Sequence, residues 1–138
     1  MSKLRIKRPV HTTGLFVKEK IMIKRKNEQT IEVRKNMRGG EGEVKFIHYF
    51  TKGEIKAPCR LFSDIILSPG SSIGPHEHSG EDEVYVIRQG KGLMIDGDKE
   101  FTVETGDAVL TGSGASHSVK NIGNEDLIIT AVIMSYHA

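Results

Sequence analysis

Four residues of types that bind metal ions stand in two short segments of the chain. His76, His78 and Glu83 lie close together in the sequence, and His117 lies in a second segment. Neutral imidazoles together with a carboxylate suit divalent transition metals, namely Mn, Fe, Co, Ni, Cu or Zn. Four protein ligands on an octahedral ion leave two positions open, which water or a bidentate small acid can occupy. The sequence therefore predicts one divalent metal site.

These side chains converge only if β-strands carry them. Side chains at positions i and i+2 of a strand point to the same face, so His76 and His78 aim together if their segment is extended. Glu83 opens the next strand, and Tyr85 shares its inward face. His117 must come from a distant strand that crosses beside these two, as happens in a barrel.

The rest of the chain has the pattern of an all-β protein. From residue 44 onward, short apolar segments are separated by glycine and other turn residues. Strands at intervals of about 8–12 residues are typical of an antiparallel sandwich or small barrel. We expect strands at residues 44–50, 59–67, 83–88, 93–96, 100–104, 108–111, 116–121 and 127–134. Residues 21–34 are interpreted as one or two strands and residues 37–42 as a loop.

Two motifs resemble those of cupins, a family with a double-stranded β-helix (jelly-roll) barrel. The first cupin motif, G(X)5HXH(X)4E(X)6G, is matched at Gly70, His76, His78, Glu83 and Gly90. The second, G(X)5PXG(X)2H(X)3N, is matched at Gly106, Gly114, His117 and Asn121. The proline of the second motif is replaced here by Gly112, and this replacement removes none of the candidate metal ligands. The resemblance covers about residues 44–134 and implies a cupin barrel with an N-terminal extension.

The chain is expected to divide into an N-terminal arm with edge strands, residues 1–43, and a cupin barrel, residues 44–138. The first 26 residues hold nine Lys or Arg and one acid, Glu19. No aromatic interleaving or nucleic-acid-binding motif accompanies this charge, so we interpret the arm as a solvated extension or an edge strand. Exchange of the arm between two copies would cover edge strands, and we therefore expect a homodimer.

The resemblance also implies a small carboxylic acid as the ligand. Single-domain cupins with these motifs are often similar to oxalate decarboxylases and oxidases, which hold Mn and let the acid chelate it. Mn is therefore the favoured metal, with Fe, Zn or Ni as alternatives. The resembled decarboxylases have two cupin domains and a lid carboxylate, neither of which this sequence identifies. An Fe-dependent dioxygenase, a Zn or Ni isomerase and a non-catalytic small-molecule binding module have the same ligands and remain open.

Three further residues are candidates for contact with the acid. An arginine near the open metal positions would pair with the free carboxylate. Arg60 is the candidate because it begins the strand that leads to the first motif, although it could equally be an exposed charge at the strand end. Tyr85 and Met94 are expected to line the interior. No residue is identified as catalytic.

The sequence also predicts where the protein is found. No apolar run approaches the ~20 residues of a membrane helix, and no apolar segment with a cleavage site follows the basic residues near the N-terminus. Cys59 is the single cysteine, so no intramolecular disulfide can form. We therefore expect a cytoplasmic protein without a membrane partner.

Overall fold

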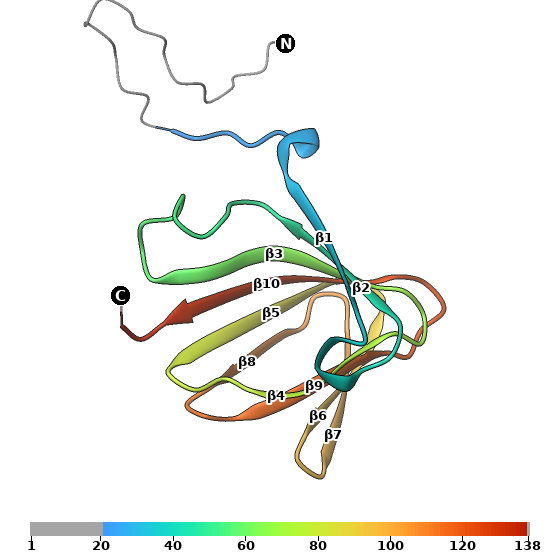
Figure 1. Cartoon of the computed structure of the whole chain (residues 1–138). Helices are drawn as coiled ribbons and strands as arrows, with labels where there is room; N and C mark the ends of the chain where they lie inside the picture. Colours follow the sequence, from blue (N-terminus) through green and yellow to red (C-terminus); the bar gives the residue numbers. More distant parts are fainter. Residues whose placement is uncertain (1–20, 138) are drawn as a thin grey trace, which may run out of the picture.

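The computed structural model describes residues 21–137, which form two antiparallel β-sheets (Figure 1). The larger sheet has the strand order β1-β2-β3-β10-β5-β8 and the smaller has the order β4-β9-β6-β7. The strands of the larger sheet are β1 (Thr30–Lys35), β2 (Glu43–His48), β3 (Cys59–Leu67), β10 (Leu127–Ser135), β5 (Glu81–Gln89) and β8 (Ala108–Gly112). Those of the smaller are β4 (Ser72–Glu77), β9 (Ser116–Asn121), β6 (Lys91–Asp96) and β7 (Lys99–Glu104).

The all-β jelly-roll fold expected from the sequence is confirmed. The ambiguous segment before residue 35 forms a short 3-10 helix, η1 (Lys26–Glu28), followed by β1. The helix begins where Glu28 Oε1 accepts a hydrogen bond of 2.8 Å from the Arg25 backbone N–H. Residues 1–20 of the expected arm lie outside the described residues. Within residues 21–137, no helix is long and apolar enough to cross a membrane.

The hydrophobic core lies between the apolar faces of the two sheets. On β5 the alternation of a strand places Tyr85 and Ile87 inward, each 1% exposed, while Arg88 points outward. Ile73 on β4 and Val119 on β9 supply apolar side chains from the smaller sheet. Burial of one such side chain stabilises the fold by roughly 1.5–3 kcal/mol. The core therefore holds the two sheets face to face.

A second 3-10 turn, η2 (Met37–Gly39), connects β1 to β2 and lies against β4. It lies within the segment expected to be a loop. The chain just after it is attached to β4 by two hydrogen bonds between Glu41 and Ser72, each 2.9 Å long. Met37 packs against the core from this turn. The segment from Met37 to Glu41 is thereby held beside the strand that carries His76.

Candidate metal centre

Two of the candidate ligands are neighbours on adjacent strands of the smaller sheet. His76 on β4 and His117 on β9 are direct partners in the antiparallel pairing of these strands. The register shifts between Ile73 and His76, and Pro75 within this interval has no N–H to donate to β9. A bulge of this kind changes the direction of the neighbouring side chains.

The other two ligands come from the segment that passes from the smaller sheet to the larger. His78 follows the end of β4, and its backbone exchanges two hydrogen bonds with the loop before β9, to Ala115 (3.0 Å) and from Gly114 (2.9 Å). Glu83 lies on β5 in the larger sheet and is 3% exposed. The four side chains therefore meet between the two sheets.

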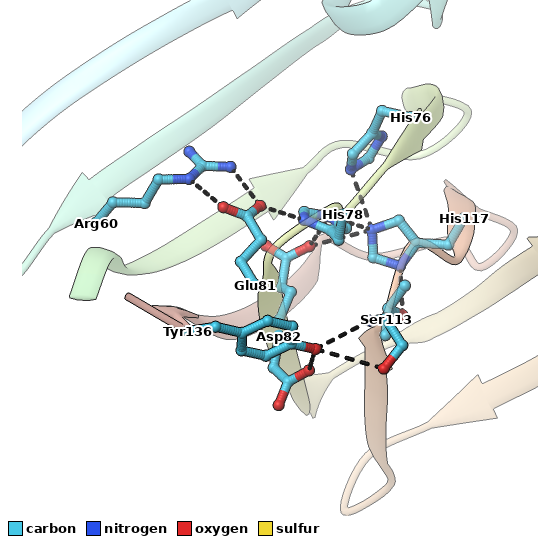
Figure 2. Close-up of polar contacts among 10 residues, drawn as sticks. Arg60, His76, His78, Glu81, Asp82, Ser113, His117 and Tyr136 are labelled. Carbon is cyan, nitrogen blue, oxygen red and sulfur yellow. Dashed lines mark hydrogen bonds and ion pairs between the residues drawn. The ribbon is translucent and has the colours of Figure 1, made fainter. Parts of the chain in front are cut away.

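The ligand atoms themselves lie close together (Figure 2). Nε2 of His117 is 3.0 Å from Nε2 of His76 and 3.1 Å from Nε2 of His78. Oε1 of Glu83 is 2.8 Å from Nε2 of His78 and 3.1 Å from Nε2 of His117. One ligand atom from each residue lies within 4.8 Å of the other three. A single metal ion could contact all four.

Each imidazole is held from behind through its other ring nitrogen. The Nδ1 atoms of His76, His78 and His117 lie 2.8, 2.7 and 2.8 Å from Gly74 O, Glu81 Oε2 and Thr111 Oγ1, respectively. A carbonyl and a carboxylate oxygen accept hydrogen bonds, so Nδ1 carries the proton in the first two rings. A hydroxyl oxygen can accept the same bond from the third. The Nε2 lone pairs then face one another, as they do when imidazoles bind a metal.

The buried carboxylate in the group has no proton donor of its own. Among residues 21–137, no group donates a hydrogen bond to Oε1 of Glu83 with acceptable geometry. With the imidazole protons on Nδ1, the two nearby Nε2 atoms have none to offer. Leaving a charged oxygen buried without a partner costs more than about 1–3 kcal/mol. A cation between the carboxylate and the imidazoles would remove this cost.

The pKa values of the ligands agree with a site prepared for a cation. Burial lowers the pKa of His76, so this imidazole is neutral at neutral pH. The Glu83 carboxylate, 2.8 Å from Nε2 of His78, raises the pKa of His78 because it favours a proton on that nitrogen. Burial raises the pKa of Glu83, but contacts with the two neighbouring imidazoles outweigh burial and leave the pKa below its usual value. The same negative charge that favours a proton on His78 also favours a metal ion at this position.

The candidates for contact with the acid lie in different surroundings. Arg60 and Tyr85 line a cavity of about 70 Å³ together with His76 and Glu83. The Tyr85 ring stacks on the His117 ring, with centroids 5.1 Å apart. Met94 is 4% exposed in the core and, with His117, borders a separate hollow.

Arg60 is occupied by an acidic partner. Its Nε and Nη2 atoms each lie 2.8 Å from an oxygen of Glu81. This bidentate contact, together with the hydrogen bond from His78, lowers the pKa of Glu81 to about 2. Arg60 thus supports the carboxylate that orients His78 (Figure 2).

The one departure from the second cupin motif has a structural reason. Gly112 on β8 is the direct strand partner of Asp82 on β5. A Cβ atom at position 112 would overlap the Asp82 carboxylate. The Tyr136 hydroxyl donates a hydrogen bond of 2.6 Å to Asp82 and lies 3.0 Å from the backbone N of Ser113, which donates to it. The glycine therefore leaves room for this contact between the chain end and the loop that leads to His117.

Two supporting residues were not identified from the sequence. Glu81 and Thr111 hold His78 and His117, respectively, by their Nδ1 atoms. Thr111 is the strand partner of Glu83, a relation that depends on the pairing of β5 with β8. In the sequence, the supporting role of Thr111 is indicated only by its place as a polar residue at the end of the apolar segment 108–111.

Comparison with known proteins identifies the family of this chain. A family model described as a cupin domain matches residues 63–133. This chain belongs to the cupin family. The membership of the cupin family that the two motifs predict is thereby confirmed.

Two curated proteins are similar to this cupin. An oxalate-binding protein of Thermotoga maritima is 45% identical over 113 residues, which cover 82% of this chain and 93% of that protein. An uncharacterized protein of Methanocaldococcus jannaschii is 34% identical over 74 residues, which cover 54% of this chain and 59% of that protein.

Solved structures give the same result for the fold. The crystal structure of a predicted oxalate decarboxylase from Thermotoga maritima matches with a TM-score of 0.78 and 45% identity, over 83% of this cupin and 99% of that chain. The cupin domain of Schizosaccharomyces pombe Cnp3 matches with a TM-score of 0.61 over 75% of this cupin and 68% of that chain. Its identity is 16%, so this likeness concerns the fold alone.

Proposed function

We propose that this cupin binds one divalent transition metal through His76, His78, Glu83 and His117, and that a small carboxylic acid binds beside it. The observation that carries the proposal is the convergence of three Nε2 atoms and one carboxylate oxygen within 4.8 Å. Oxalate is the first candidate for the acid, because the similar Thermotoga maritima protein is called an oxalate-binding protein.

The metal, when bound, would supply a Lewis acid and a template for a chelating acid. The chain itself orients the ligands, since Glu81 and Thr111 hold two of the imidazoles. It also limits the size of the ligand. The cavity of about 70 Å³ beside His76 has room for a few water-sized groups. Ile73 and Ile133 form apolar parts of its wall.

Mn is the favoured metal, and Fe, Zn and Ni fit the same donor set. Affinity alone does not select Mn, because affinity for nitrogen and oxygen ligands rises toward Cu. The metal content of protein purified from its own host therefore distinguishes an Mn-dependent oxalate site from an Fe-dependent dioxygenase or a Zn or Ni isomerase.

The geometry favours binding of the acid over its decarboxylation. Decarboxylation to formate needs a proton at the carbon that loses CO₂. Both carboxyl groups beside the imidazoles are already engaged: Glu81 contacts Arg60 and His78, and Glu83 is a proposed metal ligand. Neither is therefore placed to donate a proton to the acid. Decarboxylase- or oxidase-like turnover is therefore the second candidate, and product analysis separates the two.

The test compares the full-length protein with two histidine variants. His117→Ala removes one ligand, and His137→Ala removes an exposed histidine outside the group. We expect Mn bound by the wild type and by His137→Ala, and at least tenfold weaker binding by His117→Ala. Equal metal content in all three proteins would contradict the proposed site.

The same proteins test the ligand. Calorimetry of the Mn-loaded wild type with oxalate is expected to show one binding event per chain, and loss of this event in His117→Ala. Incubation with oxalate in air, with assays of formate and hydrogen peroxide, then distinguishes a decarboxylase, an oxidase and a binding protein. Absence of oxalate binding to the Mn-loaded wild type would contradict oxalate as the ligand.

A further inference from the structure

Three arginines line the cavity beside the metal ligands: Arg34, Arg38 and Arg60. Two of them are paired with a carboxylate. Arg60 contacts both oxygens of Glu81 at 2.8 Å. Arg34 contacts both oxygens of Glu32, at 2.9 and 3.3 Å, and also lies over the Phe46 ring. The positive charge of each is therefore already balanced within the protein.

Arg38 differs from the other two. It makes no ion pair and no side-chain hydrogen bond with any residue of 21–137. A guanidinium has five N–H donors in a planar fork that matches a carboxylate. Arg38 is thus the exposed arginine at this cavity whose fork has no partner among the described residues.

The backbone holds Arg38 in a conformation that arginine rarely adopts. Its φ of 55° and ψ of 31° lie in the left-handed region. Asn36, two residues earlier in the same turn, also lies there with a φ of 49°. A non-glycine residue there costs of order 1 kcal/mol or more, and such residues gather at functional sites. The residue with this unfavourable backbone conformation is thus one that lines the cavity.

Two glycines fix the turn against the strand that carries His76. A Cβ atom at Gly74 would overlap the carbonyl oxygen of Arg38, and a Cβ atom at Gly40 would overlap the carbonyl oxygen of Ser72. The backbones of η2 and β4 can approach this closely only because neither position has a side chain. The position of Arg38 relative to His76 is therefore defined by backbone packing.

We propose that Arg38 binds the carboxylate of the small acid and selects dianionic acids over monoanionic ones. The inference rests on the proposed function. A divalent metal with one glutamate ligand has a net charge of +1. When a dianionic acid binds there, the net charge of the site becomes −1. Arg38 supplies the missing positive charge. A bidentate contact of this kind is charge-assisted and directional.

The test measures binding of oxalate and of acetate to Mn-loaded full-length protein by calorimetry. Arg38→Ala is expected to weaken oxalate binding by about 10- to 100-fold, the loss expected for charge-assisted hydrogen bonds. Acetate binding and the affinity for Mn are expected to stay within about threefold. The matched control is Arg88→Ala, which removes a guanidinium that lies outside this cavity and is paired with Asp64, and it should leave oxalate affinity within about threefold of wild type.

Arg38→Gly separates ligand binding from folding. Glycine accepts a positive φ without strain, so this variant should melt at or above the temperature of the wild type. We expect it to lose oxalate affinity as Arg38→Ala does. A structural role for Arg38 would not produce weaker binding in a more stable protein.

The outcomes separate this inference from the proposed function. Wild-type affinity for oxalate in Arg38→Ala and Arg38→Gly would overturn the role of Arg38 and leave the metal and acid site intact. An equal loss of oxalate and acetate affinity would overturn the selection of dianions. A Mn-loaded wild type that binds neither acid would overturn both proposals.

Discussion

At the scale of single residues, the candidate metal centre depends on what lies behind each ligand. His76, His78 and His117 could each rotate about their side-chain bonds, and four ligands of the right type do not by themselves define a site. The contacts at Nδ1 remove this freedom and place the proton on the nitrogen that faces away from the centre. Such outer contacts usually change metal affinity when they are removed.

Thr111→Val tests this dependence at one atom. The variant keeps the shape of the buried side chain but removes the hydroxyl that accepts from His117 Nδ1, 2.8 Å away. We expect the affinity for Mn to fall by about 10- to 100-fold, measured by competition with a chelator. The fold should be retained.

The matched control is Thr130→Val. Thr130 also uses its hydroxyl, which donates to Asp64 at 2.7 Å, but Asp64 is not among the metal ligands. Its substitution should leave the affinity for Mn within about twofold. A similar affinity in both variants would show that Thr111 does not orient His117.

The sequence predicted which candidate ligands belong together but not the residues that support them. His76, His78, Glu83 and His117 follow from motif spacing, and the alternation that places Tyr85 inward follows from the period of a strand. The role of Thr111 depends on the pairing of β5 with β8, which is a long-range relation. The left-handed conformation of Arg38 has no signature in residue type, because most arginines are not found there.

At the scale of secondary-structure elements, the contact between η2 and β4 depends on Gly74. Gly74→Ala places a methyl group against the carbonyl oxygen of Arg38. We expect the free energy of unfolding to fall by about 1–3 kcal/mol, because backbone atoms must move apart. Urea unfolding of the metal-free protein measures this change.

Gly123→Ala is the control for this substitution. Among residues 21–137, apart from its two chain neighbours, no atom lies closer than 3.5 Å to the position of its added Cβ, and its φ is not in the left-handed region. The effect on stability should be within about 0.5 kcal/mol. Equal midpoints for Gly74→Ala and Gly123→Ala would contradict the close approach of η2 to β4.

The contacts that attach β1 to β2 should make the free energy of unfolding depend on pH. Glu32 on β1 is hydrogen-bonded to Arg34 and to His48 of β2, and these contacts lower its pKa to about 2. A carboxylate with a lowered folded-state pKa stabilises the fold above its unfolded pKa, near 4.5. This contribution is lost as the pH falls toward 2.

The variant Glu32→Gln should therefore be less stable than the wild type at pH 6, and the difference should shrink between pH 4.5 and pH 2. The difference should be less than about 1 kcal/mol, because the Glu32 side chain is 42% exposed and solvent screens its contacts. Urea unfolding across this range measures it. A difference that does not change with pH would contradict this assignment.

The elements themselves were predicted from the sequence where turns are marked by glycine. The expected strand 59–67 has the same bounds as β3, and 116–121 has the same bounds as β9. The segment 21–34 was ambiguous because its apolar residues have no clear period. Ile31 and Val33 of β1 are exposed, so burial imposes no pattern on this edge strand.

At the scale of the whole molecule, the outer face of the larger sheet is apolar in one region. Ile31, Ile47, Ile66 and Ile128 border an open hollow of about 940 Å³ on this face. Ile31 is 61% exposed in the single chain. Apolar regions with a polar rim commonly mark interaction surfaces. The homodimer expected from the sequence would cover this face by a second copy of the chain.

Ile31→Glu is expected to convert such a dimer to monomers. In a two-fold dimer each substitution acts twice, so two isoleucine side chains lose their burial and two carboxylates take their place. Because Ile31 is 61% exposed in the single chain, loss of burial alone amounts to about 2–4 kcal/mol for the two side chains, or at least about 30-fold in the dissociation constant. Sedimentation equilibrium of the full-length protein at micromolar concentration measures the change.

Leu110→Glu is the control, because it places the same charge on the same sheet at a distant position. Leu110 is 70% exposed on β8, at the edge of the larger sheet opposite to β1. If the face around Ile31 is the dimer contact, only Ile31→Glu should sediment as a monomer. A wild-type monomer would contradict the dimer itself, and dissociation by both variants would place the contact elsewhere. Since the candidate metal ligands lie between the sheets and Ile31 borders the hollow on the outer face, Ile31→Glu should not alter Mn binding by more than about twofold.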